Sequence, residues 1–144
     1  SHMQQTPVLT PHDGEFARLF GAMPPDGARA RILAASDAAR QSGCVVLLKG
    51  HRTVIAAPDG RCAVNPTGNP GMASGGSGDV LAGLVVSFAA QGIPPFEAAC
   101  AAAWLHGAAG DDCACKIGEY GMTASDILRA VPSRLHVRNS ITYF

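Results

Sequence analysis

A glycine-rich stretch in the middle of the chain constrains its fold more than any other feature. Residues 65–79 read Asn-Pro-Thr-Gly-Asn-Pro-Gly-Met-Ala-Ser-Gly-Gly-Ser-Gly-Asp and hold five of the 17 glycines; the apolar run 80–90 follows at once. Glycine lets the backbone approach a ligand closely and adopt positive φ. The first amides of a helix have no partner inside the helix. The stretch therefore predicts a turn and helix start that bind an anion such as phosphate.

The acid that closes this stretch is a candidate catalytic base. Asp79 begins the predicted helix, where the helix dipole favours negative charge, and a carboxylate beside a bound phosphate can take a proton from a hydroxyl. The alternative is an ordinary first-turn acid. The anion-binding turn would consist of Gly75, Gly76, Ser77 and Gly78. A flexible turn with Ser77 as the N-cap is compatible with that function. The stretch matches neither a Walker loop nor the dinucleotide fingerprint.

The composition is that of a globular chain and argues against nucleic-acid and membrane partners. Of the 144 residues, 47% are apolar, and 11 basic residues balance 11 acidic ones without any basic run. No apolar run reaches the roughly 18 residues of a membrane span. Five cysteines without a Cys-x-x-Cys pair favour reduced thiols and a cytoplasmic location. We expect one domain over residues 4–144, after a tag remnant at residues 1–3.

Hydrophobic patterning predicts an α/β fold whose helices gather in the C-terminal half. Residues 44–48 form a continuous apolar run, typical of a strand buried on both faces. A Pro-Asp-Gly turn at 58–60 between the runs 52–56 and 61–64 predicts a hairpin. Residues 8–10 resemble a strand end. Helices are expected at 14–20, 28–41, 78–91, 95–116 and 124–131.

Finer expectations concern helix ends and faces. Asp13 is expected to cap the first helix, and Thr123-x-x-Asp126 is a capping pattern for the last one. The helix that follows the glycine turn is apolar nearly all round, so it should be buried. The helix over 28–41 should place Ile32, Leu33 and Ala35 inward and Arg29, Arg31 and Arg40 outward.

Two further polar residues follow predicted strands, where ligands of open α/β sheets collect. Lys49, directly after the buried strand and before Gly50, suits a phosphate or nucleotide; an ordinary solvated lysine is the alternative. His12 lies just past the first strand end, and the alternative is a surface histidine. On pattern alone, His51 and His106 are interpreted as structural. No His, Cys or carboxylate cluster has metal-ligand spacing, so no protein-held transition metal is expected.

These residues together resemble a known family. Residues 69–79, Asn-Pro-Gly-Met-Ala-Ser-Gly-Gly-Ser-Gly-Asp, resemble the signature of the ADP/ATP-dependent NAD(P)H-hydrate dehydratases, members of the ribokinase-like superfamily. The glycine–Asp element alone would indicate only the superfamily. Supporting segments occur in the family's order and cover most of residues 8–131. They lie at 9–19, 48–50, 91–98, 105–111 and 123–126.

The resemblance implies repair of nicotinamide cofactors. In this reaction ADP or ATP phosphorylates the extra hydroxyl of hydrated NADH or NADPH, and elimination of phosphate restores the ring. Asp79 would bind and activate that hydroxyl, the turn at 75–78 would stabilise the transferring phosphoryl group, and His12 would contact the hydrated dinucleotide. The nucleotide would be bordered by Lys49, Gly50, His51, Arg52, Thr53 and Gly78. Mg²⁺ would be held mainly by phosphates and water.

The resemblance also implies a partial ribokinase-like domain. His12 corresponds to the middle of the family's domain, Asp13 stands where the family commonly has proline, and the strands and substrate-binding positions that precede them have no counterpart. Faces left uncovered would favour a homo-oligomer or pairing with the missing N-terminal half. Two alternatives remain open. One is a ribokinase-like kinase of a small alcohol, against which Asn-Pro-Gly-Met at 69–72 argues. The other is a catalytically silent nucleotide-binding or oligomerising module.

Overall fold

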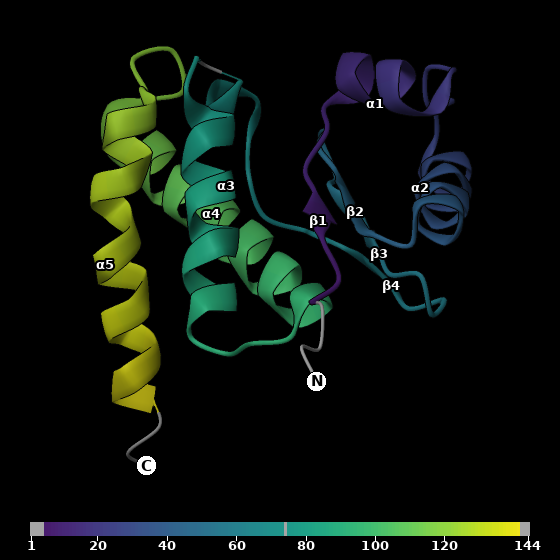
Figure 1. Cartoon of the computed structure of the whole chain (residues 1–144). Helices are drawn as coiled ribbons and strands as arrows, with labels where there is room; N and C mark the ends of the chain where they lie inside the picture. The colour runs from purple at the N-terminus through teal and green to yellow at the C-terminus, as the bar shows by residue number, and fades with distance from the viewer. Residues whose placement is uncertain (1–4, 74, 142–144) are drawn as a thin grey trace.

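A mixed four-stranded sheet forms the centre of the structure. The computed structural model describes residues 5–73 and 75–141, and its strands are neighbours in the order β1-β2-β3-β4 (Figure 1). They are β1 (Val8–Leu9), β2 (Val45–Leu48), β3 (Val54–Ala56) and β4 (Cys62–Val64). β1 pairs with β2 in parallel, whereas β2 with β3 and β3 with β4 are antiparallel. The predicted buried strand, the hairpin and the α/β class are therefore confirmed.

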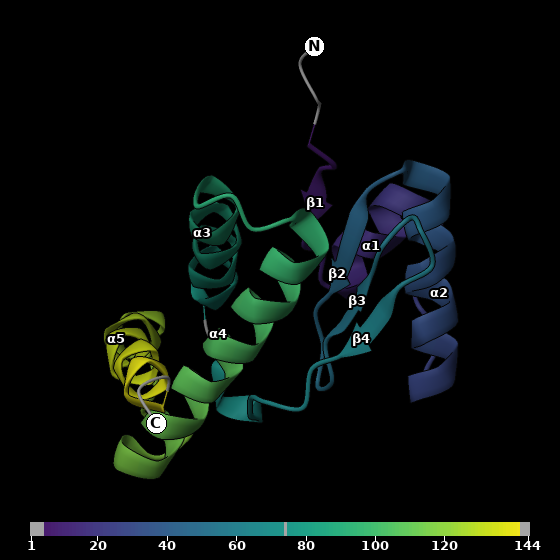
Figure 2. The same cartoon turned by 90° about the horizontal axis from the view of Figure 1, so that it is seen from below.

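Helices cover both faces of this sheet, which explains why β2 is apolar at every position. Side chains of a strand alternate between its two faces. Val45 and Leu47 pack against the third and fourth α-helices, while Val46 and Leu48 pack against the first two. All four side chains are at most 2% exposed. Figure 2 shows α2 and α4 on opposite sides of the sheet.

The helices begin close to where the sequence predicts them. They are α1 (Asp13–Phe20), α2 (Ala28–Ser42), α3 (Ser77–Ala90), α4 (Pro95–Ile117) and α5 (Ala124–Ile141), with a 3-10 turn at Pro70–Met72. The run of small residues at the start of α4 is buried and lets this helix pack closely on the sheet; it includes Ala98, Ala99, Ala102 and Ala103. Within the described ranges, no helix combines the length and the apolar character needed to cross a membrane.

Two details of α1 and α2 differ from expectation. His12, and not Asp13, caps α1: its Nδ1 accepts a hydrogen bond from the Glu15 amide at 3.1 Å, and Glu15 Oε1 accepts one from the His12 amide. Leu33 is 56% exposed, whereas Arg31 points inward. The reason is helical geometry, because Arg31 lies one turn before the buried Ala35 and shares its face, while Leu33 lies on the opposite face.

The expectation that α3 is buried all round is wrong. Only Ser77, Leu81 and Val85 are buried, along the stripe that packs on α4 and the sheet. Val86 is 67% exposed, and a Cβ on Gly83 would meet no atom within 4 Å. The described part of the chain therefore covers one side of this apolar helix and leaves the other uncovered.

The last helix, α5, continues past its expected end at residue 131. Pro132 lies inside it, although proline removes one hydrogen bond of a helix. Arg134 lies beyond the proline and pairs with Asp112 of α4 through two hydrogen bonds of 2.6 and 2.7 Å. This bidentate pair holds the second part of α5 against α4.

The predicted cap of α5 is confirmed and gives a first prediction. Thr123 Oγ1 donates to Asp126 Oδ2 at 2.8 Å and accepts from the Asp126 amide at 3.3 Å. Thr123→Ala should therefore lower the free energy of unfolding by about 1 kcal/mol. Urea unfolding measures this, and Ser133→Ala, at an exposed position inside α5, should cause no loss. Equal stability of the Thr123→Ala protein and the wild type would contradict the cap.

Candidate active site

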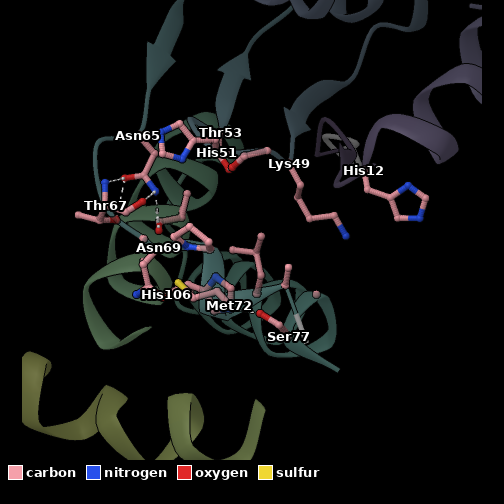
Figure 3. A pocket seen from close by; sticks show the side chains of 18 residues that line it. His12, Lys49, His51, Thr53, Asn65, Thr67, Asn69, Met72, Ser77 and His106 are labelled. Carbon is pink, nitrogen blue, oxygen red and sulfur yellow. Dashed lines mark hydrogen bonds between the residues drawn. The ribbon is translucent and has the colours of Figure 1, made fainter. Parts of the chain in front are cut away.

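A cavity of about 630 Å³ opens between the sheet and the C-terminal helices (Figure 3). Its sheet side follows the ends of β1 and β2, and its helix side combines the start of α3 with the middle of α4. The loop over residues 65–73 closes a third side. Among the described residues that line the cavity, none is an aspartate or a glutamate.

The sheet side contains most of the residues expected to border a nucleotide. Lys49, Gly50, His51 and Thr53 line the cavity, whereas Arg52 is not among the lining residues. The Lys49 amide donates to the Pro11 carbonyl at 2.9 Å, which brings the ends of β2 and β1 together. The predicted position of Lys49 after β2, at the carboxyl edge of the sheet, is confirmed.

His12 lies at the rim of the same edge. Besides the Nδ1 bond to the Glu15 amide, its Nε2 lies 3.2 Å from Glu15 Oε1. Glu15 Oε1 also lies 3.8 Å from Lys49 Nζ. The hydrogen bond from the His12 amide lowers the pKa of Glu15, and the nearby positive charges act in the same direction. In Figure 3 the His12 ring lies apart from the cluster around Met72.

The helix side brings Ser77 and Gly78 to the cavity but not the rest of the predicted turn. Gly75, Gly76 and Asp79 are exposed and do not belong to the lining. A Cβ on Gly78 would lie 2.9 Å from Lys49 Nζ, so the ammonium group lies directly against the start of α3. A lysine and the positive end of a helix dipole thus converge in one place. This arrangement attracts an anion.

The loop over residues 65–73 is fixed to α4 by side chains that the sequence analysis did not single out. Asn65 Nδ2 donates to the Ala103 carbonyl at 3.0 Å, and Thr67 Oγ1 to the Trp104 carbonyl at 3.0 Å. The Asp111 carboxylate accepts from the Gly68 amide at 3.1 Å and from Asn69 Nδ2 at 2.9 Å. The available signal for Asp111 was the pair of adjacent acids, Asp111 and Asp112, which follows a run of small residues in α4.

His106 is a second residue that pattern alone did not assign to the site. It lines the cavity, is 9% exposed, and its Nε2 lies 3.2 Å from Ser77 Oγ. Burial lowers the pKa of His106; a hydrogen bond to the backbone of Ser77 opposes this, and the charge of Lys49 adds to the lowering. The imidazole is therefore neutral at neutral pH, and the cationic side chain beside it is Lys49.

Comparison with known proteins decides the family. Residues 1–133 match the family model described as NAD(P)H-hydrate dehydratase. The chain belongs to this family. A bifunctional NAD(P)H-hydrate repair enzyme of Moorella thermoacetica is 52% identical over 125 residues, which cover 87% of this chain and 24% of the relative. The ADP-dependent (S)-NAD(P)H-hydrate dehydratase of Neisseria meningitidis is 46% identical over 136 residues, covering 94% of this chain and 45% of the relative.

Solved structures confirm the ribokinase-like fold. The Bacillus subtilis ADP/ATP-dependent NAD(P)H-hydrate dehydratase, co-crystallised with ATP/Mg²⁺, superposes with a TM-score of 0.84 at 35% identity and covers 94% of this chain and 50% of that one. A ribokinase-like superfamily protein of Enterococcus faecalis superposes with a TM-score of 0.71 at 34% identity, and the match covers 90% of this chain and 43% of that one. The chain thus spans between a quarter and about half of the length of the relatives it matches.

Proposed function

We propose that this chain carries the nucleotide and phosphoryl-transfer part of an ADP- or ATP-dependent dehydratase acting on hydrated NADH and NADPH. The observation that carries the proposal is the convergence of Lys49 with the start of α3 at Gly78, in a cavity whose described lining residues include no acid. Membership of the family, and relatives whose names specify ADP or ATP, support the choice of nucleotide.

The proposed mechanism assigns each wall of the cavity a task. The stretch Lys49–Thr53 borders the nucleotide, and Lys49 with the α3 amides binds its phosphates. Amides aimed at a transferring phosphoryl group stabilise the charge that develops there. Asp79 takes the proton of the substrate hydroxyl as that oxygen attacks the terminal phosphorus. The bond from this phosphorus to the bridging oxygen breaks, so that AMP leaves when ADP is the donor and ADP leaves when ATP is the donor. Phosphate then leaves with the C–O bond electrons, and loss of a proton from the adjacent ring carbon restores the double bond.

The remaining roles in the proposed mechanism belong to the two glycines before Ser77 and to His12 at the rim of the cavity. Gly75 and Gly76 hold the backbone before Ser77 and Gly78 in the conformation that starts α3; Gly76 has a φ of 87°, which favours glycine. His12 at the rim contacts the hydrated dinucleotide. Among residues 5–73 and 75–135 no three His, Cys, Asp or Glu side chains form a group that could hold a metal ion. We therefore propose that Mg²⁺ comes as the phosphate complex of the nucleotide.

Incubation of the chain with hydrated NADH, Mg²⁺ and either ADP or ATP tests the proposal. Recovery of the near-ultraviolet absorbance of NADH, with one phosphate released per NADH formed, is the expected result. Turnover of an unrelated alcohol alone would favour a small-alcohol kinase. Nucleotide binding without any turnover would favour the silent nucleotide-binding or oligomerising module, an alternative for which the exposed position of Asp79 argues. A cytoplasmic location and a homo-oligomer, or pairing with an N-terminal half, stay predictions.

Lys49 gives the sharpest binding prediction. Lys49→Met keeps most of the side-chain length but removes the charge, so ADP should bind roughly 10- to 100-fold more weakly, the value of a charge-assisted hydrogen bond. Isothermal titration calorimetry with ADP and Mg²⁺ measures the change. Lys116→Met is the matched control, since Lys116 is exposed near the end of α4 and does not line the cavity. Unchanged ADP affinity in the Lys49→Met variant would remove Lys49 from the phosphate site.

A further inference from the structure

His106 and Ser77 form a buried polar pair that the proposed chemistry leaves unused. Within the described residues, the buried polar side chains are Asn65, Ser77 and His106. Asn65 bonds to the backbone of α4, whereas Ser77 Oγ and His106 Nε2 bond to each other at 3.2 Å. Burying a polar group costs free energy unless it is hydrogen-bonded. This pair therefore persists because each side chain satisfies the other.

The position of Ser77 gives the pair its significance. Ser77 is the first residue of α3, and its neighbour Gly76, the N-cap, has no side chain that could cap the helix. Gly78 follows, so glycine flanks Ser77 on both sides, and glycine gives the backbone its greatest freedom. The bond to His106 is the side-chain hydrogen bond that fixes this turn from a second helix.

The part of α4 that carries His106 is well packed and can hold such a hydrogen bond in place. Its neighbouring residues Leu105, Gly107 and Ala108 are buried, so the backbone that carries His106 is held by packing on several sides. A neutral ring has one donor and one acceptor nitrogen, so it can hold the Ser77 hydroxyl without adding a second cation beside Lys49.

We propose that His106 is a positioning residue, which through Nε2 holds the Ser77 hydroxyl and thereby aims the first amides of α3 at the phosphoryl group. The proposal rests on the proposed function for its kinetic consequence. The hydrogen bond itself, and the orientation of the turn that depends on it, do not require turnover.

A pair of substitutions at one position separates positioning from packing. The glutamine amide reaches approximately the place of Nε2, whereas the shorter asparagine amide reaches that of Nδ1. His106→Gln should therefore keep kcat within about threefold of the wild type, and His106→Asn and Ser77→Ala should each lower it roughly 10- to 100-fold, the cost of a small misplacement. KM for ADP should change much less than kcat, because the phosphate-binding lysine is untouched.

The double variant tests whether the two residues act through each other. If they do, Ser77→Ala combined with His106→Asn should be about as slow as the slower single variant, because the shared bond is lost only once. Cys113→Ala is the control: Cys113 is buried on the same helix and its thiol donates to the Asp126 carbonyl at 3.2 Å, outside the cavity lining. It should lower the melting temperature and leave kcat unchanged. Equal kcat in the His106→Gln and His106→Asn variants would overturn the proposal. So would a double variant whose loss of kcat equals the product of the losses in the two single variants.

A second measurement decides the proposal without turnover. In ¹⁵N-labelled protein, the amide resonances of Gly76 and Gly78 should move in the same direction in Ser77→Ala and His106→Asn, and stay in place in His106→Gln and Cys113→Ala. Titration with inorganic phosphate should then shift the Gly78 amide less in the first two variants than in the wild type. If the wild-type chain binds ADP without turning over hydrated NADH, only the proposed function is contradicted. The amide shifts then decide whether His106 has the positioning role. Unmoved amides in His106→Asn would overturn the positioning role.

Discussion

Asp79→Asn is expected to lower kcat for hydrated NADH by roughly 10²- to 10⁴-fold, the usual contribution of a general base. Asparagine keeps the size of the side chain and its polarity but has no basic carboxylate. Because Asp79 is exposed in the first turn of α3, the substitution breaks no buried contact. Stability should fall by less than about 1 kcal/mol, through the lost interaction with the helix dipole. ADP affinity should remain, because Lys49 and Gly78 are unchanged.

The matched control is another exposed first-turn acid. Glu97 lies in the first turn of α4, pairs with Arg61 at 2.6 Å, and does not line the cavity. Glu97→Gln should leave kcat unchanged and alter stability very little, as is usual for an exposed ion pair. Steady-state assays, thermal melts and ADP titrations on both variants make the comparison. If Asp79→Asn and Glu97→Gln retain equal turnover, Asp79 serves only the helix dipole and another group takes the proton.

The sequence was sufficient where a local pattern determines the structure. The apolar run at 44–48 predicted a doubly covered strand because each face of β2 meets its own pair of helices. Thr123 and Asp126 predicted a cap because all of its hydrogen bonds lie within four residues. The position of Lys49 at the edge of the sheet followed from the length of its strand and the direction of the chain.

Prediction failed where the partner is distant in sequence. Arg31 points inward because Asp13 and the Lys49 carbonyl accept its hydrogen bonds, and both lie 18 residues away. Ser77 and His106 are 29 residues apart, and Gly68 and Asp111 are 43 apart. No periodicity or spacing connects such pairs. The prediction that α3 is buried failed for a related reason. An apolar pattern shows that a face is suited to burial, but it does not show which part of a chain covers that face.

Gly107→Ala is expected to be strongly destabilising, although it adds only one methyl group. A Cβ at this position would overlap Thr67 Oγ1 and lie 2.7 Å from the Thr67 carbonyl carbon, so the backbone of the loop would have to move. Overpacking of this kind costs about 1–3 kcal/mol, which outweighs the roughly 0.5–1 kcal/mol that alanine gains over glycine inside a helix. The displaced loop should also weaken ADP binding, since Thr67, Gly68 and Asn69 line the cavity.

Gly83→Ala in the neighbouring helix α3 should change stability in the opposite direction. A Cβ there would meet no atom within 4 Å, so only the helix propensity changes, and stability should rise by about 0.5–1 kcal/mol. Urea midpoints of the two variants should therefore move in opposite directions from the wild type, although the chemical change is identical. Adding Thr67→Ala to Gly107→Ala should recover only part of the loss, because the overlap with Oγ1 disappears while the close approach to the carbonyl carbon remains. Equal midpoints for Gly107→Ala and Gly83→Ala would show that the loop is not packed against Gly107, and that the hydrogen bonds of Asn65, Thr67 and Asp111 hold this wall of the cavity without it.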